Sequence, residues 1–190
     1  AKDRAQYSYL DRTTNFAQYT KIIIDPIELW IAADTDLSDE EQAELQKLAD
    51  YFYETVHSSL SQDYQIVEAP GADVMRLRIA LTDVDSANPA MNTVSTVLPV
   101  GLAISSGKKL ATGSHAYVGK AGVEVELLDS LSGKRLGAAI DERAGGKNPF
   151  NGRWGDAKKA FDYWADLMRE RLQRLTRASR MKSSMQNVYI

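Results

Sequence analysis

VMRLRIALTDV, residues 74–84, is the most regular strand pattern in this chain of 190 residues. Met75, Leu77, Ile79 and Leu81 alternate with residues that are smaller or more polar. Because successive side chains of a strand point to opposite faces, this alternation predicts a strand with one buried face and one wetter face. Such a sheet needs a cover on one side only.

Two amphipathic segments can supply that cover. Ser38-Asp39-Glu40-Glu41 is a capping box, in which the serine hydroxyl and the last carboxylate satisfy each other's backbone amides. Apolar residues follow at helical spacing to about Ser59. Asp156 can cap a second helix. The predicted apolar face of that helix consists of Ala157, Ala160, Phe161, Trp164, Met168, Leu172 and Leu175.

Other segments rich in β-branched residues complete the sheet that we predict. They are residues 21–33, in which Pro26 should mark a bulge or an edge, residues 65–67, residues 116–129 and residues 136–142. Leu131-Ser132-Gly133-Lys134 reads as a hairpin turn between the last two. This order predicts an α+β fold, a two-layer sandwich whose mostly antiparallel sheet of about five strands carries two main helices on one face.

The chain divides into three parts by composition. We predict an N-terminal arm over residues 1–18, a single α+β domain over 19–180 and a C-terminal tail over 181–190. The domain contains an irregular insertion at about residues 86–113. The apolar run 94–104 within it is either buried core, which we favour, or an exposed contact patch for a partner or a bilayer surface.

The charge is unevenly distributed. The net charge of −3 and the pI of about 5.5 give no general attraction to nucleic acid, and we expect none as a partner. The segment from Arg169 to Lys182, however, holds six basic residues against one acid, Glu170. It is either a solvated helix end, which we favour, or a contact surface that uses Arg174 and Arg177.

Cysteine is absent, so disulfides, thiolate nucleophiles and cysteine-based zinc sites are excluded for these 190 residues. No apolar run approaches the ~18–20 residues of a membrane span. Because the sequence begins at Ala1 rather than methionine, we expect a mature or trimmed product.

The loop in IDERAGGKNPF, residues 140–150, lies between a predicted strand and a predicted helix, as a phosphate loop would. A Walker loop requires G-x-x-x-x-G-K-[ST], but Asp141 stands at the first glycine and Asn148 at the hydroxyl residue. A flexible connection is therefore favoured. If the loop does bind an anion, the candidate residues are Arg143, Gly145, Gly146, Lys147 and Arg153.

No catalytic motif is present. His57 and His115 are isolated in the sequence, and no G-x-S-x-G elbow surrounds a serine. We therefore expect no enzyme activity, no cofactor and no metal.

Four segments carry a resemblance to a known family. They are YTKIIIDPIELW, LRIALTDV, VGKAGVEVELLDSLSGKRLGAAIDERAGGK and WGDAKKAFDYWADLMRERL, which together extend from about Tyr19 to about Leu172. In their order and spacing the chain resembles domain-of-unknown-function family 3313, a group of bacterial envelope lipoproteins. The resemblance implies a lipidated cysteine just upstream of Ala1 and a place on the periplasmic face of a bacterial membrane, the outer membrane in particular. It supplies no activity and no functional residues.

Three hypotheses for function follow. The leading one is a non-catalytic, lipid-anchored periplasmic module that acts in protein–protein interaction or assembly, with an envelope protein or with itself. The alternative is a domain that binds an anionic small molecule or glycan at Gly145, Gly146 and Lys147. The least favoured is a hydrolase with dispersed residues.

Overall fold

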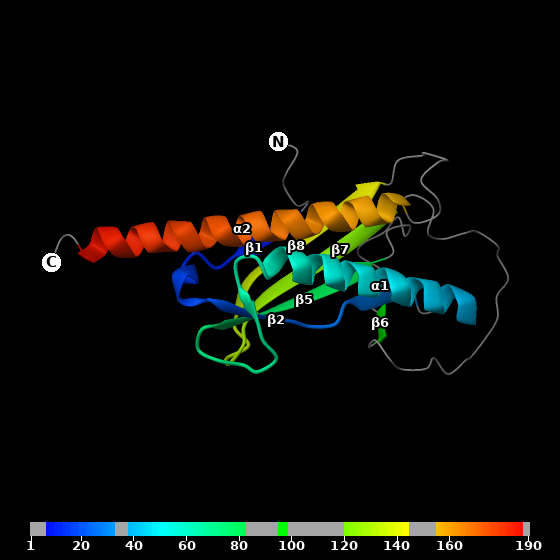
Figure 1. Cartoon of the computed structure of the whole chain (residues 1–190), viewed down its shortest axis with the longest axis horizontal. Helices are drawn as coiled ribbons and strands as arrows, with labels where there is room; N and C mark the ends of the chain where they lie inside the picture. The colour runs from blue at the N-terminus through cyan, green and yellow to red at the C-terminus, as the bar shows by residue number, and fades with distance from the viewer. Residues whose placement is uncertain (1–6, 33–37, 83–94, 99–119, 145–154, 188–190) are drawn as a thin grey trace.

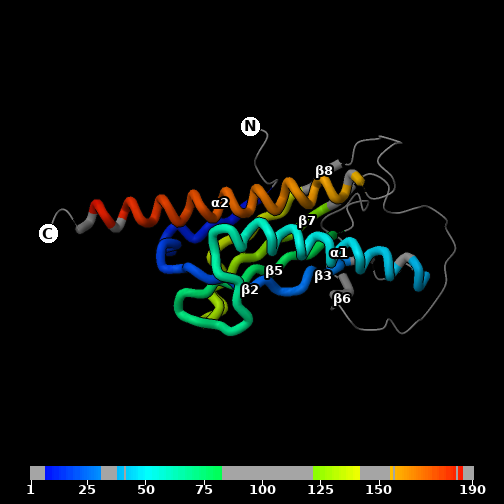
Figure 2. Tube along the Cα trace, viewed as in Figure 1, coloured from blue at the N-terminus to red at the C-terminus, as the bar shows by residue number. Residues whose placement is uncertain are grey.

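The structure, a computed structural model, describes residues 7–32, 38–82, 95–98, 120–144 and 155–187. It consists of two layers, with two long helices lying side by side on one face of a sheet (Figure 1). Helix α1 spans Asp39–Leu60 and helix α2 spans Gly155–Asn187. Both run in the same direction along the sheet, as the trace in Figure 2 shows. The predicted α+β class with two main helices is confirmed.

Within the described residues, the sheet has eight strands. They are β1 (Tyr7–Leu10), β2 (Lys21–Ile24), β3 (Glu28–Ala32), β4 (Gln65–Ile66), β5 (Val74–Thr82), β6 (Ser95–Leu98), β7 (Lys120–Asp129) and β8 (Arg135–Ala144). Their order is β1-β8-β7-β5-β2-β4, and β3 joins β5 to β6 alongside this path. A short 3-10 helix, η1, covers Phe16–Gln18.

The prediction of about five mostly antiparallel strands is correct only in part, because the sheet is larger and mixed. Strands β1, β8, β7 and β5 are antiparallel neighbours, as are β3 and β6. Strand β2 pairs in parallel with β4 and β5, and β3 pairs in parallel with β5. The physical reason is α1, since a crossover helix returns the chain to the same end of the sheet and makes the strands it joins parallel.

Pro26 interrupts the strand predicted over residues 21–33. Ile24 faces Leu77, whereas Glu28 faces Ala80, so four steps along β2–β3 match three along β5. This extra residue is the bulge expected at a proline, which cannot donate a ladder hydrogen bond. Because of this extra residue, Ile24 and Ile27 are both buried in the core although they are three residues apart, whereas a regular strand would place them on opposite faces.

The predicted arm, insertion and tail each contain regular secondary structure that the sequence pattern did not indicate. Residues 7–10 of the predicted arm form the edge strand β1 on β8, and Phe16 lies in the core. Strand β6 lies within the predicted insertion, and α2 continues to Asn187 within the predicted tail. The hairpin turn is confirmed, with Gly133 at a φ of 68° that favours glycine. The structure gives only the backbone of residues 95–98 from the 94–104 run, so whether that run is buried lies outside what is described.

The core lies between the two helices and the sheet. Phe52 of α1 stacks on Phe161 of α2 with ring centroids 4.4 Å apart, and Trp164 packs beside both rings. The hydroxyls of Tyr64 and Thr176 are hydrogen bonded at 2.9 Å in a buried position. Among the described residues, no helix combines the length and apolar composition needed to cross a membrane.

Candidate functional site

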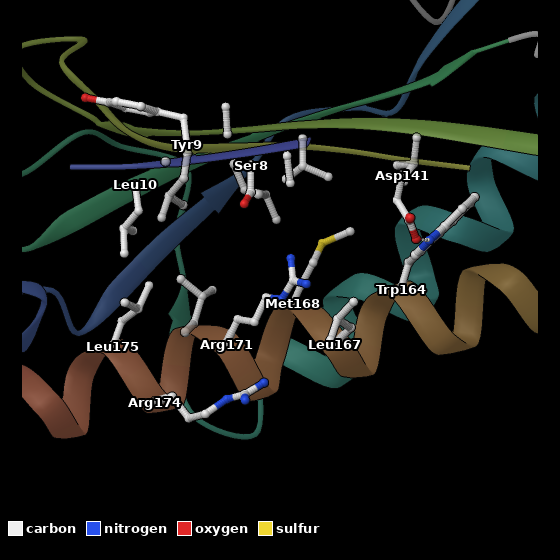
Figure 3. A pocket seen from close by; sticks show the side chains of 18 residues that line it. Ser8, Tyr9, Leu10, Asp141, Trp164, Leu167, Met168, Arg171, Arg174 and Leu175 are labelled. Atoms are coloured by element: carbon white, nitrogen blue, oxygen red, sulfur yellow. Dashed lines mark hydrogen bonds between the residues drawn. The ribbon is translucent and has the colours of Figure 1, made fainter. Parts of the chain in front are cut away.

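A cleft opens between α2 and strands β7, β8 and β1 because the middle of β8 presents small residues to the helix. Gly137 and Ala139 face inward there, opposite Leu127 and Val125 of β7. Their short side chains cannot fill the space under α2, so a hollow of about 340 Å³ is left (Figure 3).

The walls of this cleft are almost entirely apolar. Strands contribute Leu10, Leu77, Val123, Val125 and Leu127, and α2 contributes Trp164, Leu167, Met168, Leu172 and Leu175. At one end, the indole Nε1 of Trp164 donates a hydrogen bond of 2.8 Å to the Asp141 carboxylate. That bond fixes the orientation of both side chains, so the polar end of the cleft is rigid.

Two arginines of α2 line the same cleft. The half-buried Arg171 points from the helix into the hollow, beside Met168, whereas Arg174 extends along the helix away from the strands (Figure 3). Arg174 is exposed, with its guanidinium 3.8 Å from Glu170. A guanidinium inside apolar walls favours an anionic group over a cationic one.

From Arg174, which also lines the cleft, α2 continues past the sheet (Figure 1). At ~1.5 Å per residue its 33 residues extend ~50 Å, against ~33 Å for the 22 residues of α1. We call this part the α2 overhang and define it by its exposed basic residues and methionines. They are Arg174, Arg177, Arg180, Met181, Lys182 and Met185. Met181 and Met185 are 67% and 63% exposed.

The outer face of the sheet is polar and its charges pair with one another. Arg78 lies 3.2 Å from Glu28 and 3.3 Å from Glu126, and Arg135 lies 2.6 Å from Glu126. Burial raises the pKa of the neighbouring Glu124. Because these cations form ion pairs with carboxylates of the same face, we interpret this face as an ordinary solvent-exposed surface.

Of the site residues proposed from the sequence, the structure describes the side chains of Arg174 and Arg177. Arg174 and Arg177 both lie on the α2 overhang, where they are exposed. Arg143 lies in β8, where its backbone pairs with Ala121 of β7, but its side chain lies outside the described part. Gly145, Gly146, Lys147 and Arg153 lie outside the described residues, as does His115.

Metal ligation finds no support in the described ranges, where no three histidine, aspartate or glutamate side chains converge. His57 lies near the end of α1, with its ring 6.1 Å from that of Tyr53.

Sequence reasoning missed the cleft itself. The pattern that could have revealed it is Gly137-Ala138-Ala139, three small residues in the middle of a ten-residue strand. A strand that must fill space against a helix normally carries larger side chains. Ser8 and Leu10 were also missed, since β1 was placed in an arm, and Leu167 was not included in the predicted apolar face of the second helix.

Comparison with protein families gives one match. A family model described as "Protein of unknown function (DUF3313)" matches residues 1–168. A search of curated protein sequences finds no match.

The chain is also similar to several solved structures at low sequence identity. The PelC dodecamer from Paraburkholderia phytofirmans is similar at 14% identity and a TM-score of 0.44, over 86% of this chain and 95% of that one. A DUF4136 protein from Bacteroides thetaiotaomicron gives 10% identity and 0.41, over 87% and 95%. A DUF330 protein from Xanthomonas campestris gives 9% and 0.42, over 87% and 88%. With TM-scores this low, these similarities carry no argument about function.

Proposed function

The chain belongs to the DUF3313 family of proteins of unknown function, and from that premise we propose that it is a non-catalytic interaction module of the bacterial cell envelope. In this proposal the α2 overhang is the surface that binds a partner protein, and the partner presents an acidic surface to it. The anchor is a lipidated cysteine upstream of Ala1, which places the domain on the periplasmic face of the outer membrane.

The observation that carries the proposal is the composition of the overhang. Met181 and Met185 expose most of their surface on the overhang, where Arg174, Arg177, Arg180 and Lys182 are also exposed. Exposed methionines are adaptable apolar contacts, and arginines are enriched at protein interfaces. A helix end that served only for solvation would need neither methionine.

Charge determines the class of partner. Arg174, Arg177 and Arg180 are exposed at three-residue intervals along the helix. Residues at this spacing lie close together on a helix surface, so the three guanidinium groups add to one positive field. A partner with acidic residues along a helix or an edge complements that field and is steered toward it.

The test is photo-crosslinking in living cells that carry the full-length gene. A photoreactive residue at position 181 is expected to give one discrete crosslinked protein, and the double variant Arg174→Glu, Arg177→Glu should abolish it. The matched control places the photoreactive residue at Ala43, which is exposed on α1 and should give no product.

Charge reversal needs its own control, Lys47→Glu, which reverses an exposed cation on α1 and should leave the crosslink intact. A crosslinked product of twice the chain mass identifies the partner as a second copy. Crosslinking to lipid alone, or a product that survives reversal of both arginines, contradicts the proposal.

A further inference from the structure

We propose that the cleft between α2 and strands β7, β8 and β1 is a binding site for a single-chain carboxylate of the fatty-acid type. The hydrocarbon chain lies along the apolar walls, and the carboxylate is bound by Arg171. This inference goes beyond partner binding by the overhang and does not depend on it.

The walls match a hydrocarbon chain and little else. Leucine, valine and methionine side chains line both sides, and the small inward residues Gly137 and Ala139 form the floor. The polar residues that line it are Ser8, Tyr9, Asp141, Arg171 and Arg174, and Asp141 already accepts the indole hydrogen of Trp164. A ligand rich in hydrogen-bonding groups, such as a glycan, would leave those groups unsatisfied against these walls.

The size of the cleft limits the ligand to one chain. Its volume of about 340 Å³ lies near the lower end of the ~300–1,000 Å³ that is usual for small-molecule sites. A two-chain phospholipid would exceed it. One medium-length chain with a compact head group fits this space.

Arg171 sets the charge of the head group. Arg171 is half-buried, and its side chain points into the hollow beside Met168 (Figure 3). A guanidinium can bind a carboxylate through two parallel hydrogen bonds, which are stronger when the surroundings are apolar. An uncharged head group cannot make this pair.

The experiment is isothermal titration calorimetry of the purified chain with sodium laurate below its micelle concentration, compared with dodecanol. We expect saturable 1:1 binding of laurate and binding of dodecanol that is about tenfold weaker, because the alcohol lacks the charge-assisted hydrogen bonds. Equal affinity for the two compounds overturns the assignment of Arg171, and no saturable binding of laurate overturns the site.

Two variants locate the binding. Ala139→Phe fills the floor of the cleft and should abolish laurate binding, whereas Ala43→Phe adds the same bulk at an exposed position of α1 and should not. Arg171→Met removes the guanidinium but keeps a long apolar side chain, and should weaken laurate about tenfold without changing dodecanol. Lys47→Met, which removes an exposed cation on α1, is its control.

A milder change keeps the test decisive if Ala139→Phe does not fold. A Cβ on Gly137 would lie 3.5 Å from the Tyr9 carbonyl oxygen and 3.8 Å from Leu10 Cδ1, which are ordinary contacts. Gly137→Ala should therefore fold normally and weaken laurate measurably. Laurate binding that is unchanged in the folded cleft variants contradicts the proposal.

Discussion

In each half of the helix–sheet interface a helix packs on strands, but side chains fill the space between helix and strands to different degrees. Under α1, the sheet presents Ile22, Ile24 and Met75, and the helix fills the space above with Phe52 and other fully buried residues. Under α2, strand β8 presents Gly137 and Ala139, and a cleft of about 340 Å³ is left open. The difference arises from side-chain volume on one strand.

This contrast separates structural roles from binding roles. Closely packed interiors lose stability when a side chain is shortened, whereas a site that must admit a ligand has to leave space unfilled. We therefore assign the α1 half to stability, and the α2 half, with its cleft and its overhang, to binding.

The largest effect that we predict comes from the closed half. Phe52→Ala should lower the free energy of unfolding by about 3–5 kcal/mol, because it removes a fully buried ring that stacks on Phe161. Met168→Ala, on the cleft wall, should cost less than about 2 kcal/mol, since this side chain is only partly buried. Urea denaturation of both variants measures the two values. Equal costs would break the distinction between the halves.

The next effect lies where α2 leaves the core. Thr176→Val keeps the shape of the side chain but removes the hydroxyl that bonds to the buried Tyr64, at a cost of about 1–3 kcal/mol. Thr176→Ser retains the hydroxyl and should restore most of this loss. If Thr176→Val leaves the urea midpoint unchanged, the junction between core and overhang is not where the structure puts it.

Acid should loosen the contact between α2 and the turn that follows α1. The hydrogen bond from Arg169 holds the pKa of Asp63 below its ordinary value, and Gln173 adds a second hydrogen bond. A carboxyl whose folded pKa is depressed contributes stability above its unfolded pKa of about 3.9 and loses it as pH falls through the folded value. Stability should thus decline below about pH 4, and Asp63→Asn should reduce that slope in urea titrations at several pH values. An unchanged slope would count against the pair.

The smallest predicted effect belongs to the overhang. Arg174→Glu with Arg177→Glu should change the free energy of unfolding by no more than about 0.5 kcal/mol each, because both side chains are exposed. Thermal and urea midpoints close to those of the unmodified chain are expected, although partner crosslinking is lost. A large destabilisation would instead give these arginines a structural role.

The sequence predicted those parts of the fold that repeat with a fixed period. The alternation in residues 74–84 and the helical spacing after Ser38 and Asp156 both correspond to observed elements, β5, α1 and α2. The parallel pairing of β2 and β3 with β5 was missed, because periodicity specifies which face is buried but not which strands are neighbours. β1 was missed because its short exposed edge shows no buried face.

The candidate site was harder to predict, since it results from an absence of volume. The small residues of Gly137-Ala138-Ala139 point to unfilled space, but they do not by themselves distinguish a strand that leaves a cleft from one packed by a larger partner residue. Only the position of α2 above Gly137 and Ala139 decides this, and that position depends on contacts far away in the sequence. Arg174 and Arg177 were proposed from charge alone, without knowledge of the cleft that Arg174 lines.

The most direct test of the division between a closed and an open half uses methionine methyl groups as NMR reporters. Met75 lies in the closed half, Met168 in the cleft, and Met181 and Met185 on the overhang. With a soluble paramagnetic agent, we predict strong broadening of Met181 and Met185, moderate broadening of Met168 and none of Met75; added laurate should shift Met168 most. A Met168 signal that is as protected as Met75 and does not respond to laurate would contradict the account.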